Sequence, residues 1–276
     1  AALSRIPRGC VPSGVTTAAN PVVVAAILPV VAGPNNLTVN SGLWGRITDY
    51  NDGVSVQLEW TVGAYKLTSI SAYQNWYNNQ FEDTGIVPQS IVGQTVSWDN
   101  GHLWFDQYSQ ELRLTSPTGR LFDFVAGLYF QRAIDTETYR RDITQQPTAG
   151  NLVRNYGEAH YGTHGDNYSA YGEGTWNFSP TFRGITGLRL TRDSLNFYPQ
   201  RIASSPVAVP GIQPTHPIHS GDTSANGVSG RAGLQFDLSK NVMVYATYSK
   251  GYKGPAYNVF FNQTPLQFFP SALPST

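Results

Sequence analysis

The stretch Val54-Ser-Val-Gln-Leu-Glu-Trp-Thr-Val62 alternates apolar and polar side chains without a break. Successive side chains of a β-strand point to opposite faces, so this strict alternation predicts a strand with one apolar and one polar face. A strand of a soluble β-sandwich shows the same pattern. The stretch therefore predicts a two-faced β-sheet and leaves open whether water or lipid covers its apolar side.

Seven further segments carry a similar alternation, which is weaker in residues 65–77, where Leu67 and Ile70 fall out of phase. Together with the first, the predicted strands cover residues 54–62, 65–77, 107–115, 121–131, 167–178, 182–192, 228–237 and 242–251. Most are about ten residues long, which is the length that a tilted strand needs to span the hydrocarbon of a membrane.

The connections between these segments alternate between short and long. Residues 63–64, 116–120, 179–181 and 238–241 form short turns, whereas 78–106, 132–166 and 193–227 are long. Transmembrane β-barrels combine tight periplasmic turns with long extracellular loops. Soluble sandwiches rarely carry several structureless connections of this length on one side. The sequence therefore predicts an all-β, antiparallel transmembrane barrel meander.

The composition agrees with a barrel wall. Charged residues make up 13% of the chain, about half the usual share of a soluble domain, and aromatic residues also make up 13%. Mean hydropathy is only −0.28, and there is no apolar run of the kind that a transmembrane helix needs. A net charge of zero gives no electrostatic basis for a nucleic-acid partner. The single cysteine, Cys10, excludes an internal disulfide.

Charged side chains of the predicted strands fall on the polar faces. Arg or Lys in the middle of the hydrocarbon costs about 2–4 kcal/mol, so we expect these charges to face a wet barrel interior. The charged residues in question are Glu59, Glu111, Arg113, Glu173, Arg189, Arg231 and Asp237.

Four phrases on these strands resemble the barrel of TonB-dependent outer-membrane receptors. They are Tyr108-Ser-Gln-Glu-Leu-Arg-Leu-Thr-Ser116, Asp123-Phe-Val-Ala-Gly-Leu-Tyr129, Gly187-Leu-Arg-Leu-Thr191 and Tyr245-Ala-Thr-Tyr-Ser-Lys-Gly-Tyr-Lys-Gly254. Each phrase alone is weakly specific. Their order, on strands predicted independently, makes the resemblance specific from about Val54 to Phe260.

The resemblance implies a 22-stranded barrel in the outer membrane of a Gram-negative bacterium, filled by an N-terminal plug. Such receptors take up scarce ligands, typically iron–siderophore complexes, with energy delivered by TonB through a box near the N-terminus. The partners implied are outer-membrane lipid, the TonB complex through the plug region, and a small-molecule ligand such as a ferric siderophore. Neither a cofactor nor a nucleic acid is implied.

The chain departs from the family in having about eight of these strands and neither a plug-like segment nor a TonB box. We therefore expect part of a receptor: an irregular N-terminal segment (1–52), a partial barrel (53–260) and a truncated extracellular loop (261–276). An alternative is a complete eight-stranded barrel that acts as an anchor or adhesin, because eight strands can close. The first reading predicts an open curved sheet, and the second predicts pairing between the first and eighth segments.

Two groups of side chains are candidate binding residues. Aromatic and cationic residues of the long connections can grip an aromatic or anionic ligand, or else pack the loops against one another. This candidate ligand-binding group is Trp98, Trp104, Tyr139, Arg140, Arg141, Tyr156, Tyr161 and Tyr198. The second group is expected to face the lumen and to hydrogen-bond the plug, or to pair across strands. It consists of Glu111, Arg113, Glu173, Arg189 and Arg231.

Neither a metal site nor an enzyme is predicted. The pairs His216-x-x-His219 and His160-x-x-x-His164 have spacings that metal sites use, but neither has a cysteine or a clear carboxylate set beside it. We interpret them as solvated loop histidines. An outer-membrane enzyme needs a nucleophile–His–carboxylate set near the outer rim, and no recognisable motif of that kind is present.

Overall fold

The computed structural model describes residues 21–30, 37–38, 40–84, 88, 92–215 and 220–257. These residues form one antiparallel sheet of eight strands, each paired with its neighbours in the sequence. A short helix, α1 (Pro21–Ala26), precedes the sheet. The strands are β1 (Arg46–Val62), β2 (Tyr65–Asp83), β3 (Thr95–Thr115), β4 (Phe122–Thr148), β5 (Asn151–Asn177), β6 (Phe182–Ala203), β7 (Gly221–Ser239) and β8 (Val242–Lys250).

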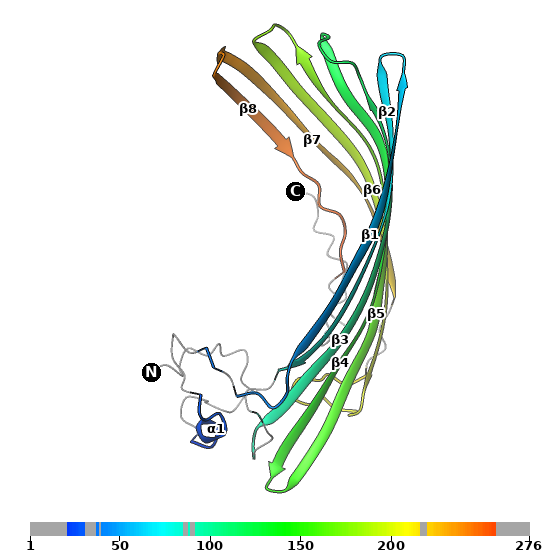
Figure 1. Ribbon diagram of the computed structural model, residues 1–276. Coiled ribbons are helices and arrows are strands. Elements are labelled where there is room, and N and C mark those ends of the chain that lie inside the picture. Colours follow the sequence, from blue (N-terminus) through cyan, green and yellow to red (C-terminus); the bar gives the residue numbers. More distant parts are fainter. Residues whose placement is uncertain are drawn as a thin grey trace.

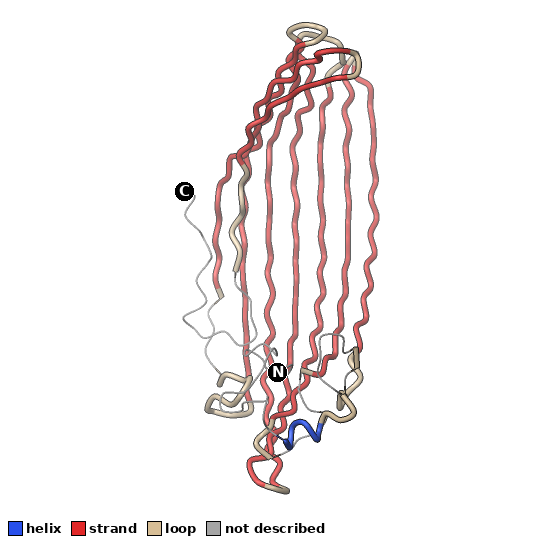
Figure 2. Tube along the Cα trace, turned by 90° about the vertical axis from the view of Figure 1, so that its left-hand side faces the viewer, coloured by secondary structure: helices blue, strands red, loops and turns tan. Residues whose placement is uncertain are grey.

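The sheet curves along its strands, so that in Figure 1 it encloses a hollow on one side. Figure 2 shows the strands side by side from that hollow side. β1 and β8 form the two edges, and in the described residues they do not pair with each other. The predicted open, curved meander is confirmed, and the closed eight-stranded alternative is wrong for this part of the chain. Among the described residues, no helix has the length and apolar character to cross a membrane.

The register sorts side chains onto two faces. Leu112 lies opposite Leu128, which lies opposite Ala170, and Ala170 lies opposite Leu190. Directly opposed residues share a face, so from β3 to β8 even-numbered side chains lie on one face and odd-numbered ones on the other. Residues 251–257 run through the hollow, where the ring of Tyr257 stacks on that of Phe197. The odd-numbered face is therefore concave.

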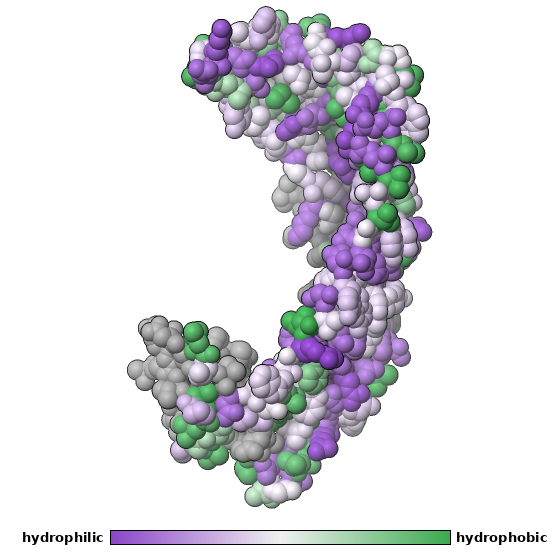
Figure 3. Space-filling model, in the orientation of Figure 1, coloured by the Kyte–Doolittle hydropathy of each residue, from purple (hydrophilic) through white to green (hydrophobic). Residues whose placement is uncertain are grey.

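The convex face carries large apolar side chains that are open to solvent. Leu188, Val228 and Leu234 are all more than half exposed. Others on this face are Val54, Val56, Leu58, Leu112, Leu128, Tyr168, Leu190, Phe236 and Val244. Hydrophobic side chains lie along the convex edge in the half that holds the short turns (Figure 3). Lipid is the partner that such a surface requires.

The apolar band of the convex face ends at a defined level. Five strands each carry an apolar or aromatic residue as the last member of the band. The next residue on the same face, two positions farther from the short turns, is polar or charged. These pairs are Tyr108 and Asp106, Phe130 and Arg132, Tyr168 and Asp166, Leu190 and Arg192, and Val228 and Asn226. We take this step, the outer boundary of the band, as the membrane surface on the side opposite the short turns.

The long connections lie on the side opposite the short turns as predicted, but much of their length is strand rather than structureless loop. Residues 132–166 form a hairpin, in which β4 and β5 continue to a two-residue turn at Ala149–Gly150. β1, likewise, begins at Arg46 rather than near Gly53. Beyond the outer boundary neither face meets lipid, so the hydrophobic period vanishes although the backbone ladder continues. Residues 261–276 lie outside the described residues.

Candidate functional site on the concave face

The middle of the concave face carries a linked set of charged and aromatic side chains. The Nη2 atom of Arg113 donates to both carboxylate oxygens of Glu111, each at 3.0 Å. The Tyr171 hydroxyl donates to Glu111 and accepts a hydrogen bond from Nε of Arg113 at 3.4 Å. Since Glu111 and Tyr171 lie on β3 and β5, the set ties together strands on either side of β4.

Arg189 extends this set along β6. Its guanidinium lies 5.3 Å from the ring centre of Tyr129 and donates to Oγ of Ser169 at 2.9 Å. Glu173 and Arg231 form a separate ion pair on the same face, with both side chains about half exposed. All five residues expected to face the lumen thus lie on the concave face, and four of them are paired. Whether they contact a plug stays a prediction.

A second group, which we call the outer cluster, lies beyond the outer boundary. Asp99 is 5% exposed and accepts two hydrogen bonds from Arg141, one of them from Nε at 2.7 Å. The Tyr139 hydroxyl also donates to Asp99. The hydrogen bonds that Arg141 donates to Asp99 raise the pKa of Arg141. Burial, and then the hydrogen bond that its hydroxyl donates to Asp99, raises the pKa of Tyr139. Asp99 and Arg141 therefore form a largely buried ion pair that joins β3 to β4.

Two carboxyl groups lie beside this pair on β4. Burial raises the pKa of Asp135, whose carboxylate accepts a hydrogen bond from Thr163. Burial also raises the pKa of Glu137. Burial, and then the neighbouring Glu137, raises the pKa of Tyr161. Burial thus disfavours the charged forms of Asp135 and Glu137. Neither carboxylate forms an ion pair like that of Asp99 and Arg141 among the described residues.

Residues 204–215 fold over the outer end of the concave face. Arg141 donates from Nη1 to the carbonyl oxygen of Gly211 at 3.4 Å, and Arg201 donates from Nη2 to that of Pro214 at 2.7 Å. Ile212 is only 2% exposed. The arginines of the outer cluster therefore hold this loop as well as the strands.

The structure divides the candidate ligand-binding group between the two faces. Tyr139, Arg141 and Tyr161 lie together on the concave face, where Tyr161 is buried against Phe197. The other members, on the convex face, are Trp98, Trp104, Arg140, Tyr156 and Tyr198. That any of the eight contacts a ligand stays a prediction.

Sequence reasoning missed several members of the concave sets. Asp99, Asp135 and Glu137 were assigned to loops, and Tyr129 and Tyr171 were not singled out although their strands were predicted. Counting odd-numbered positions along β3, β4 and β5 identifies all five, once the strands are known to extend beyond the apolar band.

The structure describes one of the two histidine pairs, His160 and His164. His160 contacts Glu158, 2.7 Å from Nε2, and Thr138 on the convex face. No group of three or more His, Cys, Asp or Glu side chains in the described ranges is arranged to hold a metal ion. His216 and His219 lie outside those ranges.

An open antiparallel meander with an exposed apolar convex face and a charged concave face defines a wall segment of a transmembrane β-barrel. The model of one family, described as TonB dependent receptor-like, beta-barrel, matches residues 13–274. The chain therefore belongs to the TonB-dependent receptors. No curated protein matches it.

Two solved structures share the fold. The ferric yersiniabactin uptake receptor FyuA from Yersinia pestis is 18% identical, with a TM-score of 0.66 over 89% of this chain and 34% of that chain. The siderophore receptor PiuA from Acinetobacter baumannii is 12% identical, with a TM-score of 0.50 over 76% of this chain and 32% of that chain. This chain thus spans about a third of the length of each.

Proposed function

We propose that this chain forms part of the barrel of an outer-membrane receptor for energy-coupled uptake of an iron–siderophore complex. The observation that carries the proposal is the two-faced open sheet, whose convex face requires lipid and whose concave face is lined with paired charges. Membership in the receptor family supports the ligand class, and so does the fact that both structural neighbours are siderophore receptors. In the intact receptor, a plug connects the barrel to TonB.

Arg189 supplies a specific chemical reason to expect an anionic group in the lumen. It packs against the rings of Tyr129 and Tyr171 and forms no ion pair within the described residues, although Arg113 and Arg231 each have a carboxylate partner. A cation without an ion-pair partner attracts anions. A ferric chelate with carboxylate or phenolate groups, or a carboxylate of the plug, fits this position.

The uptake assay that tests this function uses the full-length protein in its own host. Deletion of its gene is expected to abolish TonB-dependent uptake of radioactive iron from at least one of a panel of purified ferric siderophores. A plasmid copy restores uptake, and the same plasmid in a host without TonB does not. Unchanged uptake of every panel member in the deletion strain contradicts the siderophore assignment.

The membrane orientation is testable with inserted epitope tags. A tag between Ala149 and Gly150, at the tip of the β4–β5 hairpin, is expected to bind antibody on intact cells. A tag between Thr118 and Gly119, in a short turn, is expected to bind only after the outer membrane is permeabilised. Equal labelling of the two tags on intact cells is incompatible with the proposed orientation.

A further inference from the structure

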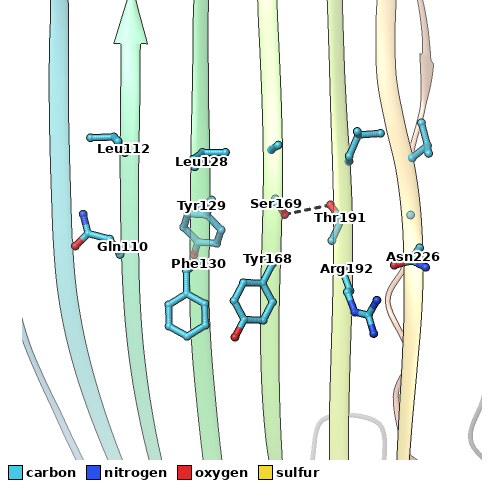
Figure 4. Close-up of a pocket in the computed structure, with 14 residues that line it drawn as sticks. Gln110, Leu112, Leu128, Tyr129, Phe130, Tyr168, Ser169, Thr191, Arg192 and Asn226 are labelled. Atoms are coloured by element: carbon cyan, nitrogen blue, oxygen red, sulfur yellow. Dashed lines mark hydrogen bonds between the residues drawn. The ribbon is translucent and has the colours of Figure 1, made fainter.

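A groove of about 620 Å³ lies on the convex face at the outer boundary of the apolar band. Leu112, Leu128, Leu190 and Val228 lie on the side of the groove toward the short turns. Phe130 and Tyr168 lie on the outer side, with ring centres 5.0 Å apart. In Figure 4 these rings and Arg192 form a row across β4, β5 and β6, below Leu112 and Leu128.

The groove is hollow because a small residue stands between large ones. Ala170 lies opposite Leu128 on one neighbouring strand and Leu190 on the other, so its methyl group leaves the space between two leucines empty. The rings of Phe130 and Tyr168, tilted by 41° to each other, limit the space on the side away from the short turns. The result is an apolar channel that is open to the surroundings of the barrel.

Two cations lie near this outer edge, and only one of them is neutralised. Arg132 forms a two-point ion pair with Asp166, 2.7 Å from Nε and 2.9 Å from Nη2. Arg192 is exposed and makes no hydrogen bond, ion pair or ring contact with any residue that the structure describes. Asn226, its neighbour across the ladder, adds an uncharged hydrogen-bonding group. The groove therefore combines an apolar channel with one unpaired cation at the membrane surface.

We propose that this groove binds one anionic, phosphate-bearing membrane lipid. One acyl chain lies in the channel over Ala170, and the phosphate lies against the Arg192 guanidinium. An amphipathic lipid fits because the apolar and cationic elements occur in the order of a lipid's chain and head group, at the level where the head groups lie. The proposal rests on the proposed function, since it requires that the convex face meet a bilayer.

The experiment uses the full-length protein in detergent and native mass spectrometry. The probes are dioleoyl phosphatidylglycerol, which is anionic, and dioleoyl phosphatidylcholine, which has the same chains and no net charge. The wild-type protein is expected to retain one phosphatidylglycerol about fivefold more tightly than phosphatidylcholine, since an interfacial cation contributes about that factor. Arg192→Gln is expected to remove this preference. Ala170→Phe fills the channel and is expected to weaken the binding of both lipids.

A matched control separates the groove from general attraction. Lys240→Gln removes the same charge from an exposed short turn and is expected to leave the preference unchanged. Equal losses for Arg192→Gln and Lys240→Gln, unchanged binding in Ala170→Phe, or a protein dimer in place of a lipid adduct each overturns the proposal. Heat-modifiable migration of each variant on gels reports barrel folding separately. A wild-type protein that lacks this migration contradicts the membrane function, whereas a folded barrel without lipid preference contradicts only the lipid site.

Discussion

Two adjacent arginines of β4 show how strongly residue parity decides chemistry in this sheet. Arg141 points to the concave face and pairs with the buried Asp99. Arg140 points to the convex face, where it pairs with Asp142 and lies 4.4 Å from the ring centre of Tyr156. A sequence window treats the two residues as one basic patch, yet they belong to opposite surfaces.

Asp99→Asn is expected to destabilise the outer ends of β3 and β4 by about 2–4 kcal/mol, because it removes the buried carboxylate that accepts two hydrogen bonds from the largely buried Arg141. Hydrogen exchange of the full-length protein measures the free energy of opening of these segments. Asp142→Asn removes the same charge from the more exposed pair, in which Arg140 also keeps Glu158 as a partner, and is expected to cost no more than about 1 kcal/mol. Equal effects of the two substitutions contradict the assigned difference between the faces.

Glu137 is expected to make the β4–β5 hairpin less stable as the pH rises. Its pKa in the folded protein is raised by burial above the ordinary value of 4.5. The stability that its neutral form provides is therefore present below pH 4.5 and lost as the pH rises through the raised pKa.

Glu137→Gln is expected to reduce this pH dependence, with Asp135, whose pKa is raised in the same direction, responsible for the remainder. Hydrogen exchange corrected for intrinsic rates measures it, and Glu158→Gln on the convex face serves as the control. Identical pH profiles for Glu137→Gln and wild type contradict the role of Glu137.

At the scale of single elements, two glycines of neighbouring strands differ in how closely other atoms approach them. A Cβ atom added to Gly127 of β4 would lie 2.7 Å from the Tyr171 ring and 2.9 Å from the carbonyl oxygen of Leu112. Gly165 of β5, on the same face, has no atom closer than 3.6 Å to such a Cβ. Both glycines lie in strands and on the concave face, but only Gly165 has room for a Cβ atom.

Gly127→Ala is therefore expected to destabilise the barrel by about 1–3 kcal/mol, whereas Gly165→Ala is expected to be neutral or slightly stabilising. Midpoints of urea unfolding of the full-length protein in detergent provide the measurement. A larger loss for Gly165→Ala than for Gly127→Ala refutes the steric argument.

The strand ends at the short turns were predictable from the sequence, and the opposite ends were not. Near the short turns, one face meets lipid and the other the lumen, so hydrophobicity alternates as in Val54–Val62. Asp135-Thr-Glu-Thr138 lies beyond the outer boundary, and in this stretch the side chains of both faces are polar, so no hydrophobic period remains. The concave position of Glu111 and Arg113 followed from alternation. The outer cluster could not be predicted in this way. Odd or even numbering assigns a residue to a face only within a strand, and β4 and β5 were not expected to continue this far.

At the scale of the whole molecule, the sheet has two unpaired edges, β1 and β8. Unsatisfied backbone groups at a strand edge are costly in lipid and favour pairing with another strand. The isolated 276-residue chain, refolded in detergent, is therefore expected to self-associate, whereas the full-length protein is expected to be monomeric. Size-exclusion chromatography with light scattering compares the two. A monodisperse monomer of the isolated chain contradicts this expectation.

Every strand in this sheet pairs only with its neighbours along the chain, so each hairpin is a unit that no distant segment crosses. For the gene, this means that copying or losing two consecutive strands leaves all remaining partners in register and alters only the circumference. Insertion or loss of a single strand reverses the direction of every strand that follows. Insertion or loss of a single residue within a strand moves the following side chains of that strand to the opposite face of the sheet. Barrel walls of this kind are therefore expected to diverge in size by whole hairpins and in strand length by pairs of residues.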